Sequence, residues 1–183
     1  MRAVILSAAG ALLVASAPAT ASVFTAGSTF AESCYRAAEA RDTSRIARDS
    51  CNKALSENAL SLYDRAGTHV NRGVLWMIMG DLGRANQDFD RALSFDPRQP
   101  EAWLNKAIAQ MKAGNGGAAL EMANRSLALR TERPALAYYI RGVANEDAGN
   151  VKAAYADFQR ARALAPKWTV PAVELARYQV RSR

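Results

Sequence analysis

The chain repeats itself with a period of 34 to 35 residues, and this period constrains its fold more than any other feature. Gly73, Ala107 and Gly142 stand 34 and 35 residues apart. Four further sets keep the same two intervals: Gly80, Gly114 and Gly149; Ala85, Ala119 and Ala154; Phe89, Ala123 and Phe158; Ala92, Ser126 and Ala161. A repeat of this length is typically one supersecondary unit that cannot bury its apolar face alone, so successive units have to stack on one another.

Each unit is predicted to be a pair of helices joined by a tight turn. The apolar first segment breaks at Gly80-Asp81, at Gly114-Asn115 and at Gly149-Asn150. Glycine and asparagine tolerate the left-handed conformation that ends a helix. Pro97 and Pro166 close the first and third units, because proline cannot continue a helix, and Thr131 takes the corresponding place in the second. Phe89 and Phe158 are expected to fill the space beside the small residues of the facing helix.

This pattern closely resembles the tetratricopeptide repeat family, whose 34-residue helix-turn-helix unit carries small and aromatic residues in this order. The resemblance covers residues 66–167. The unit with Trp103 departs most, because Ala123 replaces the bulky residue, Ser126 the alanine and Thr131 the proline, which predicts looser packing there. The resemblance implies an all-α fold, a right-handed α-solenoid of antiparallel helix hairpins with a concave face, ending in a C-terminal capping helix.

The repeat register and its limits divide the chain into six predicted segments. Before residue 66 the register weakens, although three residues stand 38 positions before Ala85, Phe89 and Ala92: these are Ala47, Cys51 and Ala54. After Pro166 the apolar residues from Val170 to Ala176 are spaced for one last helix. The segments are a signal peptide (1–21), a divergent first helical hairpin with a disulfide and a linker (22–65), a repeat unit (66–99), a degenerate unit (100–134), a third unit (135–168), and a capping helix with a basic tail (169–183).

The first 21 residues have the layout of a secretory signal peptide. One positive charge, Arg2, precedes an apolar run from Ala3 to Ala17, and the small residues Ala19-Thr20-Ala21 follow. The run is shorter than the about 20 apolar residues of a transmembrane helix. We expect cleavage after Ala21, which leaves a mature chain without stable membrane insertion that begins at Ser22, and a retained anchor is the alternative. The protein would then be exported, to the periplasm or outside the cell.

The two cysteines are predicted to form a structural disulfide. Cys34 and Cys51 are equally far from the midpoint between Asp42 and Thr43, where capping residues predict the turn of the first hairpin. In an antiparallel hairpin such residues lie side by side, and an oxidising compartment preserves the bond between them. A redox-active pair or a zinc site is the alternative. Both are poorly supported, because redox cysteines usually stand two residues apart and a zinc site needs more ligands.

Composition and short motifs point to no catalytic, cofactor or metal site. Lys and Arg outnumber Asp and Glu by 24 to 17, but the basic residues are dispersed, which argues against nucleic-acid binding. His69, the sole histidine, aligns in the register with Trp103 and Tyr138 and is interpreted as a packing residue. The glycine cluster at residues 114–117 lacks the lysine and hydroxyl residue of a phosphate loop and is interpreted as a turn. We therefore predict that the protein is not an enzyme.

The family resemblance also implies a partner site in the concave groove, which the first helices of the units line. Counted from the starts of the three units, the groove positions are Val70, Val74, Met77, Ile78, Leu104, Ile108, Met111, Tyr139 and Val143. Asn71 and Asn105, each one position after a groove residue, are placed to hydrogen-bond a peptide backbone. Most groove positions are apolar, and methionine at two of them suits adaptable contacts.

The predicted function is that of an interaction module or scaffold whose groove binds a protein or peptide with apolar anchors. Burial of part of this apolar stripe by neighbouring helices or by the terminal cap is the alternative at each position. The basic clamp that some family members use for a terminal carboxylate is missing, because Val70 and Ile140 stand in its place. The competing hypothesis is a purely structural protein of the cell envelope whose copies associate with one another, so a homo-oligomer is left open.

Overall fold

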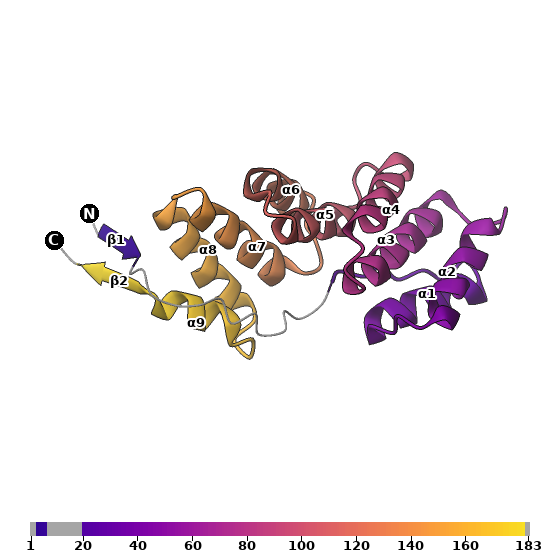
Figure 1. Cartoon of the computed structure of the whole chain (residues 1–183), viewed down its shortest axis with the longest axis horizontal. Coiled ribbons are helices and arrows are strands. Elements are labelled where there is room, and N and C mark those ends of the chain that lie inside the picture. Colours follow the sequence, from indigo (N-terminus) through magenta and orange to yellow (C-terminus); the bar gives the residue numbers. More distant parts are fainter. Residues whose placement is uncertain (1–2, 7–19, 182–183) are drawn as a thin grey trace.

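The structure is a computed structural model that describes residues 3–6 and 20–181. Within them, eight helices form antiparallel hairpins in chain order: α1 (Thr29–Ala40) with α2 (Arg45–Ser56), α3 (Leu62–Ile78) with α4 (Leu82–Phe95), α5 (Pro100–Lys112) with α6 (Gly116–Ala128), and α7 (Pro134–Asp147) with α8 (Val151–Leu164). A shorter helix, α9 (Val170–Ala176), follows, and strands β1 (Ala3–Leu6) and β2 (Tyr178–Arg181) pair with each other. The hairpins stand side by side in one elongated array (Figure 1). The predicted all-helical repeat fold is confirmed, with this short sheet as an addition.

Local sequence signals set the ends of these helices. Ser28, Ser44 and Ser61 cap α1, α2 and α3, and each side-chain oxygen accepts a hydrogen bond from the backbone N–H three residues further on. Pro100 and Pro134 stand in the first turns of α5 and α7, where a missing N–H removes no bond within the helix. Each unit therefore begins at a residue that favours the start of a helix.

The turn inside each repeat unit requires glycine. Gly80 has a φ of 85°, and the equivalent residues Gly114 and Gly149 have φ values of 79° and 75°. Other residues rarely adopt this left-handed conformation, because a Cβ would meet the following carbonyl oxygen. The breaks predicted from the register thus coincide with the observed turns.

Glycine and phenylalanine bring the two helices of a unit together. A Cβ on Gly73 would lie 2.5 Å from Cε1 of Phe89, and one on Gly142 would lie 2.8 Å from Cε1 of Phe158. The ring therefore occupies the space that a side chain on the facing helix would need. Both rings are fully buried.

The middle unit replaces this pair with two alanines. Ala107 stands where the other units have glycine, and Ala123 stands where they have phenylalanine. Both residues are fully buried in one apolar cluster, with Met122 and Leu127 packed against it. Relative to the other units, Ala107 adds a methyl group to one helix and Ala123 removes a ring from the other. Neighbouring side chains cover both alanines.

The predicted disulfide between Cys34 and Cys51 is present and joins α1 to α2. Both cysteines are buried in a cluster that includes Val74 and Met77 of α3. The bridge therefore fixes the first hairpin at its contact with the repeat units. Its turn lies at residues 41–44, between the two helices.

The two ends of the chain differ from what the sequence predicts. Instead of continuing as a basic tail, the chain forms β2 after α9, and Tyr178 pairs with Leu6 of β1. Strands of four residues show too little periodicity to be recognised, and the pairing partner lies at the far end of the sequence. Residues 1–2, 7–19 and 182–183, which include most of the predicted signal peptide, lie outside the described residues. None of the helices in the described ranges has the length and apolar character needed to span a bilayer.

Candidate functional site

An extended segment of the chain itself lies in the concave groove. Residues 20–27, which we call the strap, run along α3 and lead into α1 (indigo in Figure 1). Ala21, Ser22, Val23 and Thr25 are buried, whereas Phe24 is 60% exposed and Ala26 is also exposed. From Val23 to Ala26 buried and exposed residues alternate, as in an extended chain that presents one face to the groove in the manner of a bound peptide, whereas Ser22 is buried beside Glu39 of α1.

Two asparagines hold the backbone of the strap. Asn71 accepts a hydrogen bond from the Val23 N–H at Oδ1 (2.8 Å) and donates one from Nδ2 to the Val23 carbonyl (2.7 Å). Asn105 makes the same pair of bonds with Ala21, at 3.0 and 2.6 Å. Both asparagines are fully buried. The strap thus advances two residues per repeat unit and runs from the unit of α5 towards the unit of α3.

A glycine in α3 leaves room for the strap. A Cβ on Gly67 would lie 2.6 Å from Cγ2 of Thr25 and 2.9 Å from Cγ1 of Val23. The equivalent positions of the next two units carry Glu101 and Leu136, so glycine here is not a general feature of the repeat. Sequence reasoning missed this residue, although a glycine in the middle of a helix is the kind of signal that indicates close backbone approach.

Further bonds position the end of the strap beside α1 and α3. The Thr25 hydroxyl donates a hydrogen bond to the Ala31 carbonyl (2.8 Å), and the Ala26 N–H donates one to Asp64 (3.3 Å). The Ser22 hydroxyl contacts the carboxylate of Glu39 in α1. The strap is therefore held along its length by three different helices.

The predicted groove residues fall into two groups. Four are buried (Val70, Val74, Met77 and Leu104), and five are partly buried (Ile78, Ile108, Met111, Tyr139 and Val143). Part of the apolar stripe is therefore buried, which was the alternative at each of these positions. Val70 packs in a cluster with Val23 of the strap, and Val74 packs in the cluster that contains the cysteines of the first hairpin. Because Met77 is only 2% exposed, a charge placed there would disturb the core and would not probe the groove.

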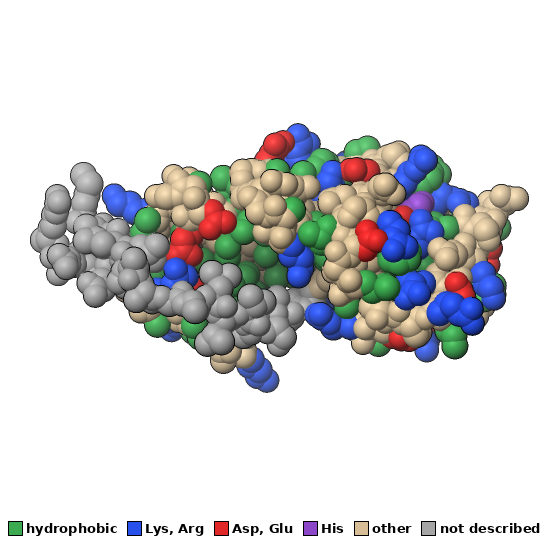
Figure 2. Space-filling view, viewed as in Figure 1, with side chains coloured by type: hydrophobic (Ala, Val, Ile, Leu, Met, Phe, Trp, Pro, Cys, Tyr) green, Lys and Arg blue, Asp and Glu red, His purple; other side chains and the backbone are tan. Residues whose placement is uncertain are grey.

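The half of the groove beyond Ala21 is apolar. Leu104 and Ile140 form a cluster with Ala21, and Ile108, Met111 and Tyr139 pack against its edge. Apolar side chains show in the hollowed middle of the face drawn in Figure 2. The ring centroid of Trp168, which lies between α8 and α9, is 5.0 Å from the ring centroid of Tyr139. Burial, followed by the carboxylates of Glu174 and Glu146, raises the pKa of Tyr139 to about 12, so this residue stays uncharged at neutral pH.

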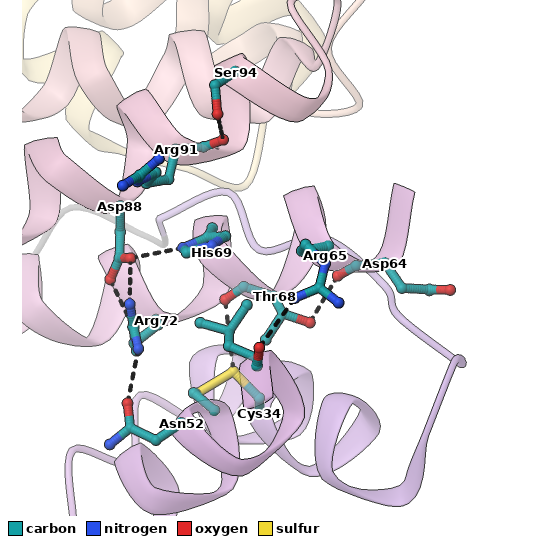
Figure 3. Close-up of polar contacts among 12 residues, drawn as sticks. Cys34, Asn52, Asp64, Arg65, Thr68, His69, Arg72, Asp88, Arg91 and Ser94 are labelled. Atoms are coloured by element: carbon teal, nitrogen blue, oxygen red, sulfur yellow. Dashed lines mark hydrogen bonds and ion pairs between the residues drawn. A yellow bond between two sulfur atoms is a disulfide. The ribbon is translucent and has the colours of Figure 1, made fainter. Parts of the chain in front are cut away.

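A polar network links neighbouring hairpins (Figure 3). Asp88 of α4 accepts hydrogen bonds from Arg72 of α3 at 2.7 and 2.9 Å, and Nδ1 of His69 lies 2.8 Å from its Oδ1. Arg72 also donates to Asn52 of α2, at 2.8 Å. His69 stacks on Phe95 with ring centroids 5.7 Å apart, so its predicted packing role is combined with a polar one.

The same arrangement recurs two units later, and its link to the preceding unit recurs one unit later, where Met122 replaces the aspartate. Arg141 donates to Asp157 of its own unit at 2.6 and 2.8 Å and to Asn124 of the preceding unit at 3.0 Å. In the middle unit Lys106 pairs with Asp90, which stands at the position of Asn52 and Asn124. The regular spacing of Arg72, Lys106 and Arg141 in the sequence could have revealed this ladder, which links repeat units.

Replacing Asp88 with asparagine is expected to lower the free energy of unfolding by about 2 kcal/mol at neutral pH, because Arg72 loses its buried partner. Burial alone would raise the pKa of Asp88, but hydrogen bonds from His69 and Arg72 outweigh it and hold that pKa below its ordinary value. The charged form thus stabilises the fold above the unfolded-state pKa, and this contribution is lost as pH falls through the lower folded-state pKa. Urea unfolding between pH 7 and pH 3 measures both effects. Wild type should lose more stability on acidification than the variant, and equal losses would contradict this assignment, with the exposed Asp49→Asn as control.

The residues that sequence reasoning considered for other chemistry lie in ordinary structural positions. Gly114 lies in the turn between α5 and α6, Gly116 and Gly117 begin α6, and a Cβ on Gly116 would be 3.5 Å from a carboxylate oxygen of Asp147. A nearby carboxylate disfavours phosphate at this turn. The described residues also hold no group of three or more His, Cys, Asp or Glu side chains that could bind a metal ion.

Comparison with known proteins agrees with the repeat register. Residues 77–139 match the model of the tetratricopeptide repeat family. No curated protein matches this chain. Among solved structures, the first tetratricopeptide domain of Spaghetti (RPAP3), bound to an HSP90 peptide, is 23% identical, with a TM-score of 0.59 over 62% of this chain and 90% of that one. MamA is 19% identical (TM-score 0.62, 78% and 80% covered), and the type IV pilus biogenesis factor PilW is 19% identical (TM-score 0.65, 80% and 65% covered). The family match over residues 77–139, the repeat register and the stacked hairpins show that the chain contains tetratricopeptide repeats.

Proposed function

We propose that this protein is an exported interaction module whose concave groove binds an extended segment of another protein. The observation that carries the proposal is the pair of asparagines, Asn71 and Asn105, that hold an extended backbone by two hydrogen bonds each. Such bonds read the backbone and leave side-chain choice to the surrounding pockets. The RPAP3 domain, a protein of similar fold, is solved with an HSP90 peptide, and this supports a peptide ligand here. The proposal assigns no catalytic step to the protein.

Export after cleavage at Ala21 would open part of this site. Both bonds of Asn105 go to Ala21, and these would be lost with the leader, whereas the bonds between Asn71 and Val23 would remain. A buried asparagine without partners strongly favours a ligand that offers a backbone N–H and carbonyl. We expect N-terminal sequencing of the protein purified from the envelope or medium to begin at Ser22, and a protein found with Met1 intact would contradict export with cleavage.

Selection from a library of random extended octapeptides, displayed on phage, tests the groove. The chain beginning at Ser22 should enrich peptides with small or apolar residues, and Asn105→Ala should weaken their binding about tenfold or more, since two hydrogen bonds are lost. Asn124→Ala is the matched control, because this asparagine lies exposed on the outer side and bonds Arg141. Peptides that bind both variants equally well would contradict a site at Asn105.

Light scattering distinguishes the alternative function, a structural protein whose copies associate. A monomer that binds the selected peptides agrees with the proposal. A stable dimer that no longer binds them, and whose dissociation restores peptide binding, would favour self-association through the groove.

A further inference from the structure

We infer that the strap is a built-in competitor for the Asn71 half of the groove, and that the partner is a segment of the same chemistry: extended, uncharged on its inward face, with small or β-branched residues at alternate positions. This inference rests on the proposed function and adds to it a ligand class and a means of regulation. A partner that uses the whole groove has to displace the strap.

The part of the groove that holds the strap favours small or apolar side chains at the inward positions. Val23 lies in a cluster with Val70, Ala92 and Ala102, so this position offers apolar contacts and no partner for a charge. Gly67 faces both Val23 and Thr25 at distances that exclude any side chain of its own. A ligand with large inward residues would meet the helix backbone at this point.

On the outward side of the strap only Ser22 is buried, in contact with Glu39 of α1, and Phe24 has no comparable fit. Phe24 is largely exposed and touches the edge of Tyr35, with ring centroids 5.3 Å apart. The strap therefore resembles a ligand whose recognition comes from backbone bonds and from the side chains at positions 21, 23 and 25. The identity of the residue at the position of Phe24 should matter little to a partner.

The covalent link to α1 allows a weakly binding strap to compete effectively. The strap continues directly into α1, whose first residue is Thr29, so its local concentration at the groove is on the order of millimolar or more. A partner has to overcome this occupancy, and its apparent affinity is reduced by the fraction of molecules with a free groove. Any change that weakens the strap without altering the groove should raise that affinity.

The test uses strap variants of the full chain, expressed with residues 1–21 and purified after any processing in the cell. The probe is a peptide with the sequence of residues 20–27, blocked at both ends and isotopically unlabelled, titrated into the ¹⁵N-labelled protein. Val23→Asp should release the strap, because it places a charge in an apolar cluster. We expect this variant to bind the peptide about tenfold or more tightly than wild type, with shifts in the side-chain amide resonances of Asn71.

Matched variants make the outcome specific. Phe24→Ser changes the outward face and should leave the affinity at its wild-type value, and Val23→Gly should give the increase without adding charge. Asn71→Ala combined with Val23→Asp should lose the binding. Thermal unfolding checks that each variant retains its fold.

Three results would overturn the inference. Equal affinity of wild type and both Val23 variants, with binding that depends on Asn105, would reject the competing strap and leave the proposed groove intact. Absence of peptide binding in every folded variant would reject the ligand class, whereas the phage selection tests the groove independently. A wild-type dimer whose strap occupies the groove of the second copy would replace an intramolecular competitor with an intermolecular one.

Discussion

Phe89→Ala is expected to lower the free energy of unfolding by about 3–5 kcal/mol, because the substitution removes a fully buried ring and leaves a cavity. The ring packs directly on the backbone of Gly73, in the space that a Cβ there would need. The loss would be a large part of the stability of a domain of this size, since small domains are only marginally stable. Chemical denaturation followed by circular dichroism measures it.

The control is a phenylalanine with the opposite environment. Phe24→Ala removes a ring that is 60% exposed and should cost no more than about 1 kcal/mol. If the two variants lost similar stability, the repeat register would not describe the packing of α3 on α4. A partial rescue of Phe89→Ala by Gly73→Ala, which recreates the two alanines of the middle unit, would support that description further.

Removing the disulfide by the double substitution Cys34→Ala and Cys51→Ala is expected to cost about 3 kcal/mol. The bridge closes a loop of 17 residues, and loss of the cross-link restores conformational entropy to the unfolded chain. The first hairpin should be affected most, because the cysteines lie in the cluster that joins α1 and α2 to α3. Unfolding of wild type with and without reductant, compared with the double variant, measures the effect.

The double variant also supplies its own control. Its stability should not respond to reductant, whereas reduced wild type should fall to nearly the same value. If oxidised wild type had the same free energy of unfolding as the variant, the bridge would not constrain the unfolded chain. Loss of strap protection in the variant would show in addition that α1 supports the groove.

The repeat units could be predicted from the sequence because each level of structure leaves a local signal there. Gly80, Gly114 and Gly149 mark turns that need a left-handed conformation, and the spacing of Gly73 and Phe89 recurs in Gly142 and Phe158. The position of the cysteines about the first turn was likewise sufficient to predict their pairing. These features depend on residues close in sequence or on a fixed period.

The contents of the groove could not be predicted in the same way. Asn71 and Asn105 were recognised as backbone ligands, but their partners lie 48 and 84 residues away in a segment without periodicity. The strap was assigned to the boundary of a leader and a linker, where no local rule predicts burial. The same limitation applies to β1 and β2, whose pairing joins the two ends of the chain.

Burial of the predicted groove residues has a physical explanation that sequence position alone does not provide. Val74 and Met77 pack in one cluster with the disulfide-bonded cysteines of the first hairpin, and Val70 packs against the strap. A divergent first hairpin and an extended segment thus cover what an isolated repeat unit would expose. Under the proposed export, removal of Ala21 would uncover the half of the groove around Leu104 and Tyr139 for a partner.

Hydrogen–deuterium exchange at the Val23 amide measures whether the strap is held in the groove, because this N–H donates to Asn71 and the residue is buried there. We expect the Val23 amide to exchange at least about tenfold more slowly than in an unstructured peptide, and Asn71→Ala to remove this protection. The exposed Asn52→Ala should leave it unchanged. Exchange of the Val23 amide at the rate of an unstructured peptide in the wild-type protein would contradict a strap held in the groove.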